Sequence, residues 1–340
     1  MIVVTGGAGF IGSAIVWRLN QRGEKNIVVV ETIDKSSKWR NLAPLRYADC
    51  IEKIKFVEML EAGKFGNTIE AIIHMGACSS TMETDEEYLT ANNYEYTARI
   101  AQWCGEHRKS RFIYASSAAT YGNGEHGYSD NEDELHKLQP LNLYAVSKHR
   151  FDLLAKSKGW FSLMTGLKYF NVFGPNEYHK EEMRSVIHKK YPDIRDKGTM
   201  TLFKSYRSDV KDGEQKRDFI YVKDAVDITL YFLDNPDKNG LYNVGTGIAG
   251  SWNDVASAMF KAVGKESAVE YIPMPDILKD KYQYYTCADM NKLRDAGCEY
   301  TCMSLDSAIK DYIGNYLVKN VFLGMEQDRE AEGSNGLYVM

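Results

Sequence analysis

Residues 3–13 read VVTGGAGFIGS: a short apolar strand, a glycine-dense turn and the start of an apolar-periodic helix. Gly6, Gly9 and Gly12 recur at every third position, with Gly7 added to the turn. Gly6 allows a tight reversal, Gly9 lets the backbone approach a pyrophosphate without a Cβ in the way, and Gly12 lets the helix pack close to the strand. The helix N-terminus offers N–H groups and a positive dipole end to phosphates. Because the glycines lie between a predicted strand and a predicted helix, they predict a dinucleotide site.

The composition is that of an ordinary soluble protein able to bury a large core, since 44% of the 340 residues are hydrophobic and 26% are charged. A net charge of −5 argues against a general binder of nucleic acid or of an anionic membrane. No stretch approaches a membrane span, and the N-terminus has no basic n-region or cleavage site. The six cysteines lack metal-like spacing, so we expect no metal site and reduced thiols in a cytoplasmic enzyme.

Strand-like apolar runs alternate with helical stretches along the first half of the chain. The expected strands are Ile2–Thr5, Ile27–Val30, Ala71–His74, Phe112–Ser116 and Met164–Tyr169, and the expected helices are Ser13–Gln21, Tyr88–His107 and Leu143–Ser157. This alternation predicts βαβ units, and therefore an α/β fold with a Rossmann-type, doubly wound parallel sheet.

The pattern changes after Gly174-Pro175. Residues 176–216 are charged and irregular, Asp218–Asn235 predicts a strand and helix that return to the first domain, and Leu241–Val244 and Ser251–Val263 predict a strand and an amphipathic helix. We therefore expect a dinucleotide-binding domain (1–174 plus 218–248) and a smaller, discontinuous α/β substrate domain (175–217 plus 249–317). The polar tail, residues 324–340, is expected to be disordered.

The second predicted strand leads to Glu31, about 20 residues past the glycine turn. A carboxylate at this position accepts hydrogen bonds from the adenosine ribose and favours NAD. Lys35, Lys38 and Arg40 follow within one short loop, and a cation there would instead meet the 2′-phosphate of NADP. The residues themselves leave NAD and NADP open.

The segment Leu143–Lys148 reads LYAVSK, a Y-x-x-x-K pattern in a helical stretch. The spacing puts Tyr144 and Lys148 on one helix face, a turn apart. The ammonium is expected to lower the pKa of the phenol, so that phenolate takes the proton from a hydroxyl while hydride leaves. Upstream, the strand over Phe112–Ser116 ends in ASSAATYG, and a hydroxyl there would bind the substrate oxygen. Together with the glycine turn, these residues predict a Ser/Tyr/Lys redox site.

These features resemble the extended short-chain dehydrogenase/reductase family. The stretches HMGACSSTMETD, ANNYEY, YASSAATYG, LYAVSK, KYFNVFGPNEYHK, RDFIYVKDAVD, LYNVGTG and EYIPMPDILKDKYQ narrow the resemblance to its ADP-heptose 6-epimerase family, in order, up to about residue 317. The resemblance implies NADP-dependent redox epimerisation at C6 of ADP-D-glycero-D-manno-heptose, through a transient ketone, for the lipopolysaccharide inner core. It also implies tightly bound NADP and a homo-oligomer, a pentamer.

The same resemblance implies roles for individual residues. One acid/base is Tyr144 with Lys148, the other is Lys180, and Ser117 is the strand-end serine, with Ser116 as the alternative. The implied cofactor positions are Gly6, Gly9, Phe10, Ile11, Gly12, Glu31, Thr32, Lys38, Lys53, Met75, Gly76, Ala77, Cys78, Ser79, Asn92, Tyr144 and Lys148. The implied substrate positions are Ser117, Asn171, Val172, Glu182, Lys189, Phe203, Lys204, Ser205, Arg217 and Tyr282.

Arg217 suits a diphosphate, since its planar guanidinium meets phosphate oxygens two at a time. Lys38 and Lys53 favour NADP, with NAD as the alternative, because Glu31 and Thr32 stand where the family usually has Asp and then Asn.

The chain departs from the family pattern at three further positions. Glu182 stands in place of a serine, Lys189 in place of a histidine, and Met75 in place of an acidic residue. These departures concern the pocket and the diphosphate end, so they bear on which sugar nucleotide binds more than on the reaction class.

Other functions would share parts of this pattern. A UDP-hexose 4-epimerase has the same glycines and Y-x-x-x-K but no use for Lys180 as a second base. A 4,6-dehydratase needs Thr-Asp-Glu at the strand end, where this chain has Ser117-Ala118-Ala119. A dinucleotide-sensing protein without catalysis typically breaks the Tyr144–Lys148 pair, which is intact here.

Overall fold

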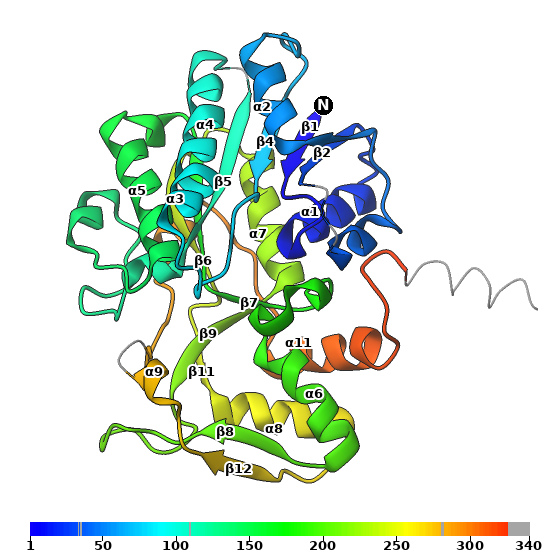
Figure 1. The fold of residues 1–340 in the computed structure, drawn as a ribbon, viewed down its shortest axis with the longest axis vertical. Helices are drawn as coiled ribbons and strands as arrows, with labels where there is room; N and C mark the ends of the chain where they lie inside the picture. Colours follow the sequence, from blue (N-terminus) through cyan, green and yellow to red (C-terminus); the bar gives the residue numbers. More distant parts are fainter. Residues whose placement is uncertain (33, 35, 109, 280–281, 326–340) are drawn as a thin grey trace, which may run out of the picture.

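The structure is a computed structural model that describes residues 1–32, 34, 36–108, 110–279 and 282–325 (Figure 1). Lys35 lies outside these residues, as does residue 326 onward of the tail for which the sequence predicts disorder. Within the described part of the chain, no helix combines the length and the apolar character that crossing a membrane requires.

Seven strands form the central sheet: β1 (Ile2–Thr5), β2 (Ile27–Glu31), β3 (Asp49–Glu52), β4 (Ala71–His74), β5 (Arg111–Ser117), β6 (Thr165–Tyr169) and β10 (Gly240–Val244). They pair in parallel in the order β10-β6-β5-β4-β1-β2-β3. β1 and β4 are buried along their whole length, as in a parallel sheet covered on both faces. The predicted Rossmann-type sheet is confirmed. The edge strand β3 was not predicted, because Ile51 is its one buried residue.

Helices cover both faces of this sheet (Figure 1). They are α1 (Phe10–Gln21) and α7 (Val222–Asp234) on one face, and α2 (Lys53–Glu61), α4 (Tyr96–Glu106) and α5 (Leu143–Ser157) on the other. Successive side chains of β1 enter different cores: Val3 packs with α2, α4 and α5, whereas Ile2 and Val4 pack with α1 and α7. This alternation follows from the two-residue period of a strand, and it makes the fold doubly wound.

The helix predicted over Tyr88–His107 consists of three segments: α3 (Glu86–Leu89), a π-helix (Thr90–Glu95) and α4. The π-helix carries Asn93, whose side chain accepts a hydrogen bond from the Cys78 N–H and donates to the Cys78 carbonyl and to Ser147 Oγ. It thereby joins the loop after β4 to α5. Apolar periodicity does not distinguish such a wide turn from an α-helix.

A second group of elements extends from the carboxyl ends of the strands, in the lower half of Figure 1. β7 (Asn171–Phe173), β9 (Lys216–Tyr221) and β11 (Ala249–Ser251) form one small sheet, and β8 (Met200–Phe203) and β12 (Val269–Ile272) form another. The helices of this group are α6 (Val186–Lys197), α8 (Trp252–Val263), α9 (Asp276–Lys279), α11 (Leu305–Asp311) and a π-helix (Tyr312–Leu317), whereas α10 (Asn291–Asp295) packs against β10 of the central sheet. Short 3₁₀-helices span Ser37–Leu42, Ala118–Tyr121, Glu132–Lys137, Trp160–Ser162 and Tyr178–Met183.

The expectation that residues 176–216 are irregular was wrong for α6 and β8. In α6, Ile187, Tyr191 and Ile194 are buried, and their spacing forms one apolar helical stripe within a charged sequence. The strand expected to begin at Asp218 pairs with β7 and β11 in a small sheet, and not with the central one. The division into two domains stays a prediction.

Candidate active site

The turn between β1 and α1 has the shape that its glycines predict. Gly6 has a φ of +64°, in the left-handed region. A Cβ on Gly12 would lie 2.1 Å from the Gly6 carbonyl oxygen, and one on Gly9 would lie 3.0 Å from the same atom. Gly9 caps α1 without a side-chain hydrogen bond, so the first N–H groups of the helix are available to an anion. This cradle fits a pyrophosphate.

A cavity of about 710 Å³ opens in front of this turn. Its walls come from the ends of β1, β4, β5 and β6, from β7 and α5, and from the 3₁₀-helix that carries Lys180. A second cavity of about 270 Å³ shares Gly6, Glu31, Lys38 and Gly76 with the first. The two cavities therefore adjoin along the glycine turn and the end of β2.

All implied cofactor positions line one cavity or the other. The larger cavity is lined by Gly6, Gly9, Phe10, Ile11, Gly12, Glu31, Lys38, Met75, Gly76, Ala77, Ser79, Tyr144 and Lys148. The smaller one adds Thr32, Lys53, Cys78 and Asn92. The structure thus brings together residues that are more than 100 positions apart in the sequence.

The smaller cavity contains both carboxylates and ammonium groups. The Ala8 N–H donates to Glu31 Oε2 at 3.2 Å, and Lys38 Nζ donates to Glu31 Oε1 at 3.2 Å and to Asp34 Oδ2 at 2.8 Å. Burial lowers the pKa of Lys38, but hydrogen bonds and charges from Asp34 and Glu31 outweigh it and leave that pKa raised. Lys53 Nζ donates to Asn92 Oδ1 at 2.5 Å. Lys53 is therefore the cation of this cavity whose partner here is uncharged.

Tyr144, Lys148 and Ser117 all line the larger cavity. Asn142 caps α5 by accepting from the Ala145 N–H, which sets Tyr144 in the first turn. Burial raises the pKa of Tyr144, and a hydrogen bond with Ser117 acts in the opposite direction. Burial also lowers the pKa of Lys148 to about 8. The spacing correctly predicts one face for both residues.

The expected lowering of the Tyr144 pKa is not found, and the reason is geometric. Lys148 Nζ donates to the Ala115 carbonyl at 2.9 Å, and burial dominates the pKa of the phenol. The Ser116 hydroxyl already has a hydrogen-bond partner, because it donates to buried Asp152 at 2.7 Å. Ser117 is therefore better placed than Ser116 to meet a ligand.

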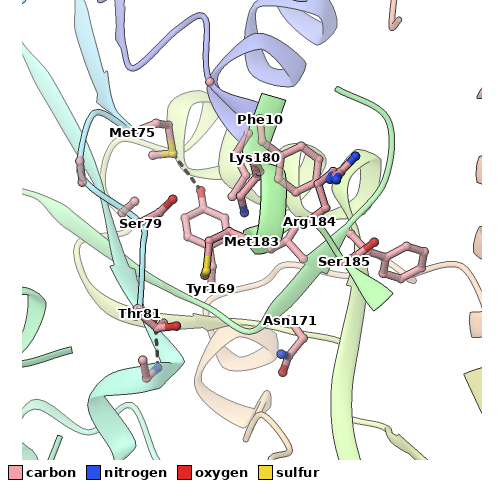
Figure 2. Close-up of a pocket in the computed structure, with 18 of the residues that line it drawn as sticks. Phe10, Met75, Ser79, Thr81, Tyr169, Asn171, Lys180, Met183, Arg184 and Ser185 are labelled. Atoms are coloured by element: carbon pink, nitrogen blue, oxygen red, sulfur yellow. Dashed lines mark hydrogen bonds between the residues drawn. The ribbon is translucent and has the colours of Figure 1, made fainter. Parts of the chain in front are cut away.

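Lys180 enters the same cavity from the loop after β7. Its Nζ lies 5.3 Å from the centre of the Phe10 ring, and Figure 2 shows the two side chains next to each other. Figure 2 also shows the contact of Tyr169 Oη with Met75 Sδ, at 3.7 Å. Burial lowers the pKa of Lys180, and the charge of Glu177 opposes this. The lysine is therefore not a solvated surface residue.

The implied substrate positions fall into three groups. Ser117, Asn171 and Val172 line the cavity. Arg217 is 7% exposed and its guanidinium lies 5.2 Å from the Tyr282 ring. The Tyr282 hydroxyl accepts from Nε1 of Trp252, which itself lines the cavity, so these two residues lie one side chain behind the wall.

The residues of the third group do not line the larger cavity. They are Glu182, Lys189, Phe203, Lys204 and Ser205. Lys189 and Glu182 are exposed, and Lys189 Nζ donates to the Glu182 carbonyl at 3.0 Å. The Ser205 N–H donates to Asp212 in the loop before β9. Two of the three departures from the family pattern therefore lie outside the cavity wall.

Several residues that the sequence analysis missed also line the cavity: Ser36, Thr81, His179, Met183, Arg184, Ser185, Phe219, Trp252, Gln283 and Thr286. His179 and Met183 to Ser185 flank Lys180, so a wider window around that lysine would have included them. The others come from loops, from β9 (Phe219) and from the start of α8 (Trp252), and their place in the wall depends on tertiary contacts. Among the described residues, no three His, Cys, Asp or Glu side chains are grouped as a metal site would require.

Comparison with known proteins identifies the class to which this fold and site belong. The NAD dependent epimerase/dehydratase family matches residues 2–245. The chain is a member of that family, whose description makes it dependent on a nicotinamide dinucleotide.

Individual relatives carry names that specify one sugar nucleotide. The chain is 49% identical to the ADP-L-glycero-D-manno-heptose-6-epimerase of Nitratidesulfovibrio vulgaris strain DP4, over 93% of this chain and 98% of that protein. It is 48% identical to the Fusobacterium nucleatum protein of the same name, over 94% and 98%. The solved Helicobacter pylori ADP-L-glycero-D-manno-heptose-6-epimerase is similar with a TM-score of 0.75 at 27% identity, covering 92% of this chain and 95% of that one. The Methanobrevibacter ruminantium UDP-N-acetylglucosamine 4-epimerase shares the fold, with a TM-score of 0.76 at 21% identity over 94% and 98%.

Proposed function

We propose that this protein interconverts ADP-D-glycero-D-manno-heptose and ADP-L-glycero-D-manno-heptose by redox epimerisation at C6. The observation that carries the proposal is the presence of two separate acid/base sets in one cavity. Tyr144, Lys148 and Ser117 come from α5 and β5, and Lys180 comes from the loop after β7. After hydride leaves one face of C6, the ketone would turn and take hydride back on its other face, and its oxygen would then meet Lys180 instead of Tyr144. The names of the relatives support ADP-heptose as the substrate.

The residues of the cavity fit a nicotinamide dinucleotide. The glycine turn would hold its pyrophosphate, and Glu31, Lys38, Lys53 and Asn92 would surround its adenosine ribose. When bound, the dinucleotide supplies a site that accepts hydride and returns it. We favour NADP over NAD because Lys53 and Lys38 both line this cavity, and Lys53 donates to the uncharged side chain of Asn92.

Side chains of the protein would transfer the protons. Tyr144 is set to exchange a proton with the substrate oxygen, while Ser117 binds the same oxygen and holds the phenol by a hydrogen bond. Lys180 is set to do the same from its own loop, since burial brings its pKa down from the ordinary range. Arg217 lies behind Trp252, and its buried guanidinium faces the Tyr282 ring. This arginine would bind the diphosphate of the substrate.

The first test is to incubate the purified protein with ADP-D-glycero-D-manno-heptose and to follow the C6 epimer by NMR. In parallel, the bound nucleotide is released and identified by mass spectrometry. Conversion without added cofactor is the expected result. If no conversion occurs although a dinucleotide is bound, the proposed substrate is wrong, and UDP- and dTDP-hexoses become the next substrates to assay.

A Lys180→Ala variant tests the second acid/base. We expect epimerisation to fall by roughly 10²–10⁴, which is typical of a lost general acid/base. A loss confined to KM would make Lys180 a binding residue, and would favour the alternative of a UDP-hexose 4-epimerase-like site. If neither wild type nor variant turns over any sugar nucleotide, the remaining alternative is a dinucleotide-sensing protein.

Within the same proposal, the product would supply heptose for the lipopolysaccharide inner core, and the enzyme would work in the cytoplasm as a homo-oligomer, a pentamer. Light scattering on the eluate of a size-exclusion column tests the oligomer. A mass equal to that of one 38.7 kDa chain would contradict it.

A further inference from the structure

Glu177 is a buried carboxylate at the base of the loop that carries Lys180, with 1% of its surface exposed. It accepts a hydrogen bond from the Ser185 N–H at 2.5 Å and another from the Ser185 hydroxyl at 2.6 Å. Ser185 is also the N-cap of α6, through the His188 N–H. The carboxylate therefore joins the two ends of a loop, residues 177–185, and Lys180 lies between those ends.

The base of this loop is held by elements from distant parts of the sequence. Tyr312, in the C-terminal π-helix, donates its hydroxyl to Glu177 Oε1 at 3.0 Å. The neighbouring residue Asn176 has a φ of +76°, and its side chain donates to Ser13 Oγ on α1 and accepts from the Leu323 N–H, each at 3.0 Å. Such a backbone conformation persists only where the surroundings hold it. The base of the loop is thus held by hydrogen bonds to α1 and to the C-terminal segment.

At the other side of the loop, Lys180 is directed into the cavity with its ammonium over the Phe10 ring. A buried ammonium that has lost water needs a negative charge nearby to remain protonated. The charge of Glu177 acts in this direction on the pKa of Lys180. Burial raises the pKa of Glu177, and the Ser185 hydrogen bonds and the charge of Lys180 oppose that rise. The two residues are therefore electrostatically coupled.

The other titratable groups of the cavity do not supply this charge. Besides the carboxylates Glu31 and Asp34, those that share it with Lys180 are His179 and Arg184 on its own loop, Tyr169 on β6, Tyr144 and Lys148 on α5, and Lys38 on the 3₁₀-helix after β2. These are cations, phenols or, for His179, an imidazole whose pKa burial lowers to about 4. The carboxylates Glu31 and Asp34 both pair with Lys38.

We propose that Glu177 is a positioning residue for Lys180: its carboxylate closes the loop that holds the lysine in the cavity and supplies the negative charge that supports the protonated ammonium. This inference rests on the proposed function, in which Lys180 is the second acid/base. It adds a residue that touches neither the substrate nor the dinucleotide.

A Glu177→Gln variant removes the charge and keeps the shape: the amide oxygen can still accept from the Ser185 N–H, and the amide NH2 then faces the Ser185 and Tyr312 hydroxyls, which can rotate to accept. The readout is the pH dependence of Lys180 acetylation by acetic anhydride, followed by mass spectrometry on the protein with its bound nucleotide. We expect Lys180 to react as the free amine at lower pH in the variant than in wild type. We also expect kcat to fall by up to about 10²-fold with KM little changed, as for a misplaced catalytic group.

A Tyr312→Phe variant is the matched control, since it removes a hydrogen bond to the same carboxylate but leaves the charge. Lys180 should then titrate as in wild type. If Glu177→Gln leaves the Lys180 titration unchanged, the proposal is overturned. An equal shift in both variants would overturn it too, because loosened packing and not the charge would then move the lysine.

A Ser185→Ala variant provides a second arm that does not depend on the folding of Glu177→Gln. It removes one bond that closes the loop and keeps the carboxylate, so kcat should fall while the Lys180 titration stays unchanged. An unchanged kcat would overturn the positioning role. Acetylation needs no turnover, so a wild-type protein that fails to epimerise ADP-heptose would contradict the proposed function separately.

Discussion

At the scale of single residues, burial outweighs neighbouring charges in setting the pKa values of Tyr144, Lys148 and Lys180. It lowers the pKa of Lys148 to about 8, lowers that of Lys180 and raises that of Tyr144. The ordinary values of Lys and Tyr both lie near about 10, so burial brings the lysines toward neutral pH and moves the tyrosine away from it. A phenolate at Tyr144 therefore needs a positive charge nearer than Lys148, whose ammonium donates to the Ala115 carbonyl.

A Tyr144→Phe variant should lose turnover by roughly 10²–10⁴ and keep its dinucleotide, because the hydroxyl exchanges the proton while the ring still fills its place. The measurements are kcat and the amount of nucleotide released on denaturation. Tyr47→Phe is the control, since Tyr47 is exposed and lines neither cavity. Wild-type turnover in Tyr144→Phe would remove this residue from the mechanism.

His74 gives the protein a pH-dependent stability. Its ring nitrogens contact Thr5 Oγ1 at 2.6 Å and Thr97 Oγ1 at 2.9 Å, and burial lowers its pKa from 6.5 to about 3. A depressed pKa means that the contribution to stability is complete above pH 6.5 and is lost as the pH falls toward 3. Over that window the free energy of unfolding should fall by about 1.4 kcal/mol per pH unit because of this residue.

Urea unfolding as a function of pH tests this expectation with a His74→Gln variant. Below the ordinary histidine pKa, the free energy of unfolding should change with pH less steeply in the variant than in wild type, by about 1.4 kcal/mol per pH unit. His179 and His188, with pKa values lowered to about 4, contribute to both proteins equally. An identical slope in the two proteins would show that His74 takes up its proton in the folded state.

At the scale of elements, the β1–turn–α1 unit places the dinucleotide cradle because its glycines bring backbone against backbone. A side chain on Gly12 would meet the Gly6 carbonyl oxygen, and a Cβ on Gly6 would lie 2.7 Å from the Gly76 backbone. This is a local property of eleven residues, which explains why the sequence predicts it correctly. The π-helix before α4 is the contrary case, because its register depends on the bonds between Asn93 and Cys78.

A Gly12→Ala variant should therefore lose its bound dinucleotide and be less stable, because its Cβ would lie 2.1 Å from the Gly6 oxygen. Gly105→Ala on α4 is the matched control: the nearest atom to its Cβ is Trp160 Nε1 at 3.5 Å, an ordinary contact. The control should be neutral or more stable by up to about 1 kcal/mol, from helix propensity. Equal nucleotide content in the two variants would contradict the role of the close approach.

At the scale of the whole molecule, a buried polar network joins the elements that carry the Ser/Tyr/Lys set. Asp152 on α5 accepts from Lys168 Nζ on β6 at 2.9 Å and from Tyr114 and Ser116 on β5 at 2.8 and 2.7 Å. Lys168 also donates to Thr120, beyond the strand end. The side chains of the ion pair have no exposed surface. The network fixes α5 against the sheet edge at which Ser117 lies.

Breaking this pair should be costly. A Lys168→Met variant leaves a buried carboxylate without its cation, and the free energy of unfolding should fall by about 3–5 kcal/mol. The double variant Asp152→Asn/Lys168→Met removes both charges and should recover part of that loss. Urea unfolding at neutral pH measures the three proteins. Equal losses in the single and double variants would show that packing, and not the unpaired charge, accounts for the effect.

Short-range signals explain most of what could be predicted from this sequence. The strands β1, β2, β4, β5 and β6 were expected within a few residues of their positions, as was α5, because their apolar periods are decided by their own residues. β3 and α6 were not predicted. β3 is an edge strand with one buried residue, and α6 is a charged helix with a narrow apolar stripe, so the apolar periodicity of both segments is weak. In the site, the implied cofactor positions line the cavities, whereas Phe203 to Ser205 do not line the larger one.

The sequence by itself determined the glycine cradle and the Tyr144–Lys148 face, because each follows from residues a few positions apart. It also determined the parallel sheet, through the alternation of strands and helices along the chain. Only the tertiary structure decided that Lys180 lines the same cavity, that Lys148 donates to Ala115, and that Glu177 closes the loop at its base. These arrangements depend on contacts beyond the local sequence, some of them between segments more than 100 residues apart, such as Lys180 with Phe10 and Glu177 with Tyr312. Burial, which sets the proton affinities of the site, exists only once those segments have packed together.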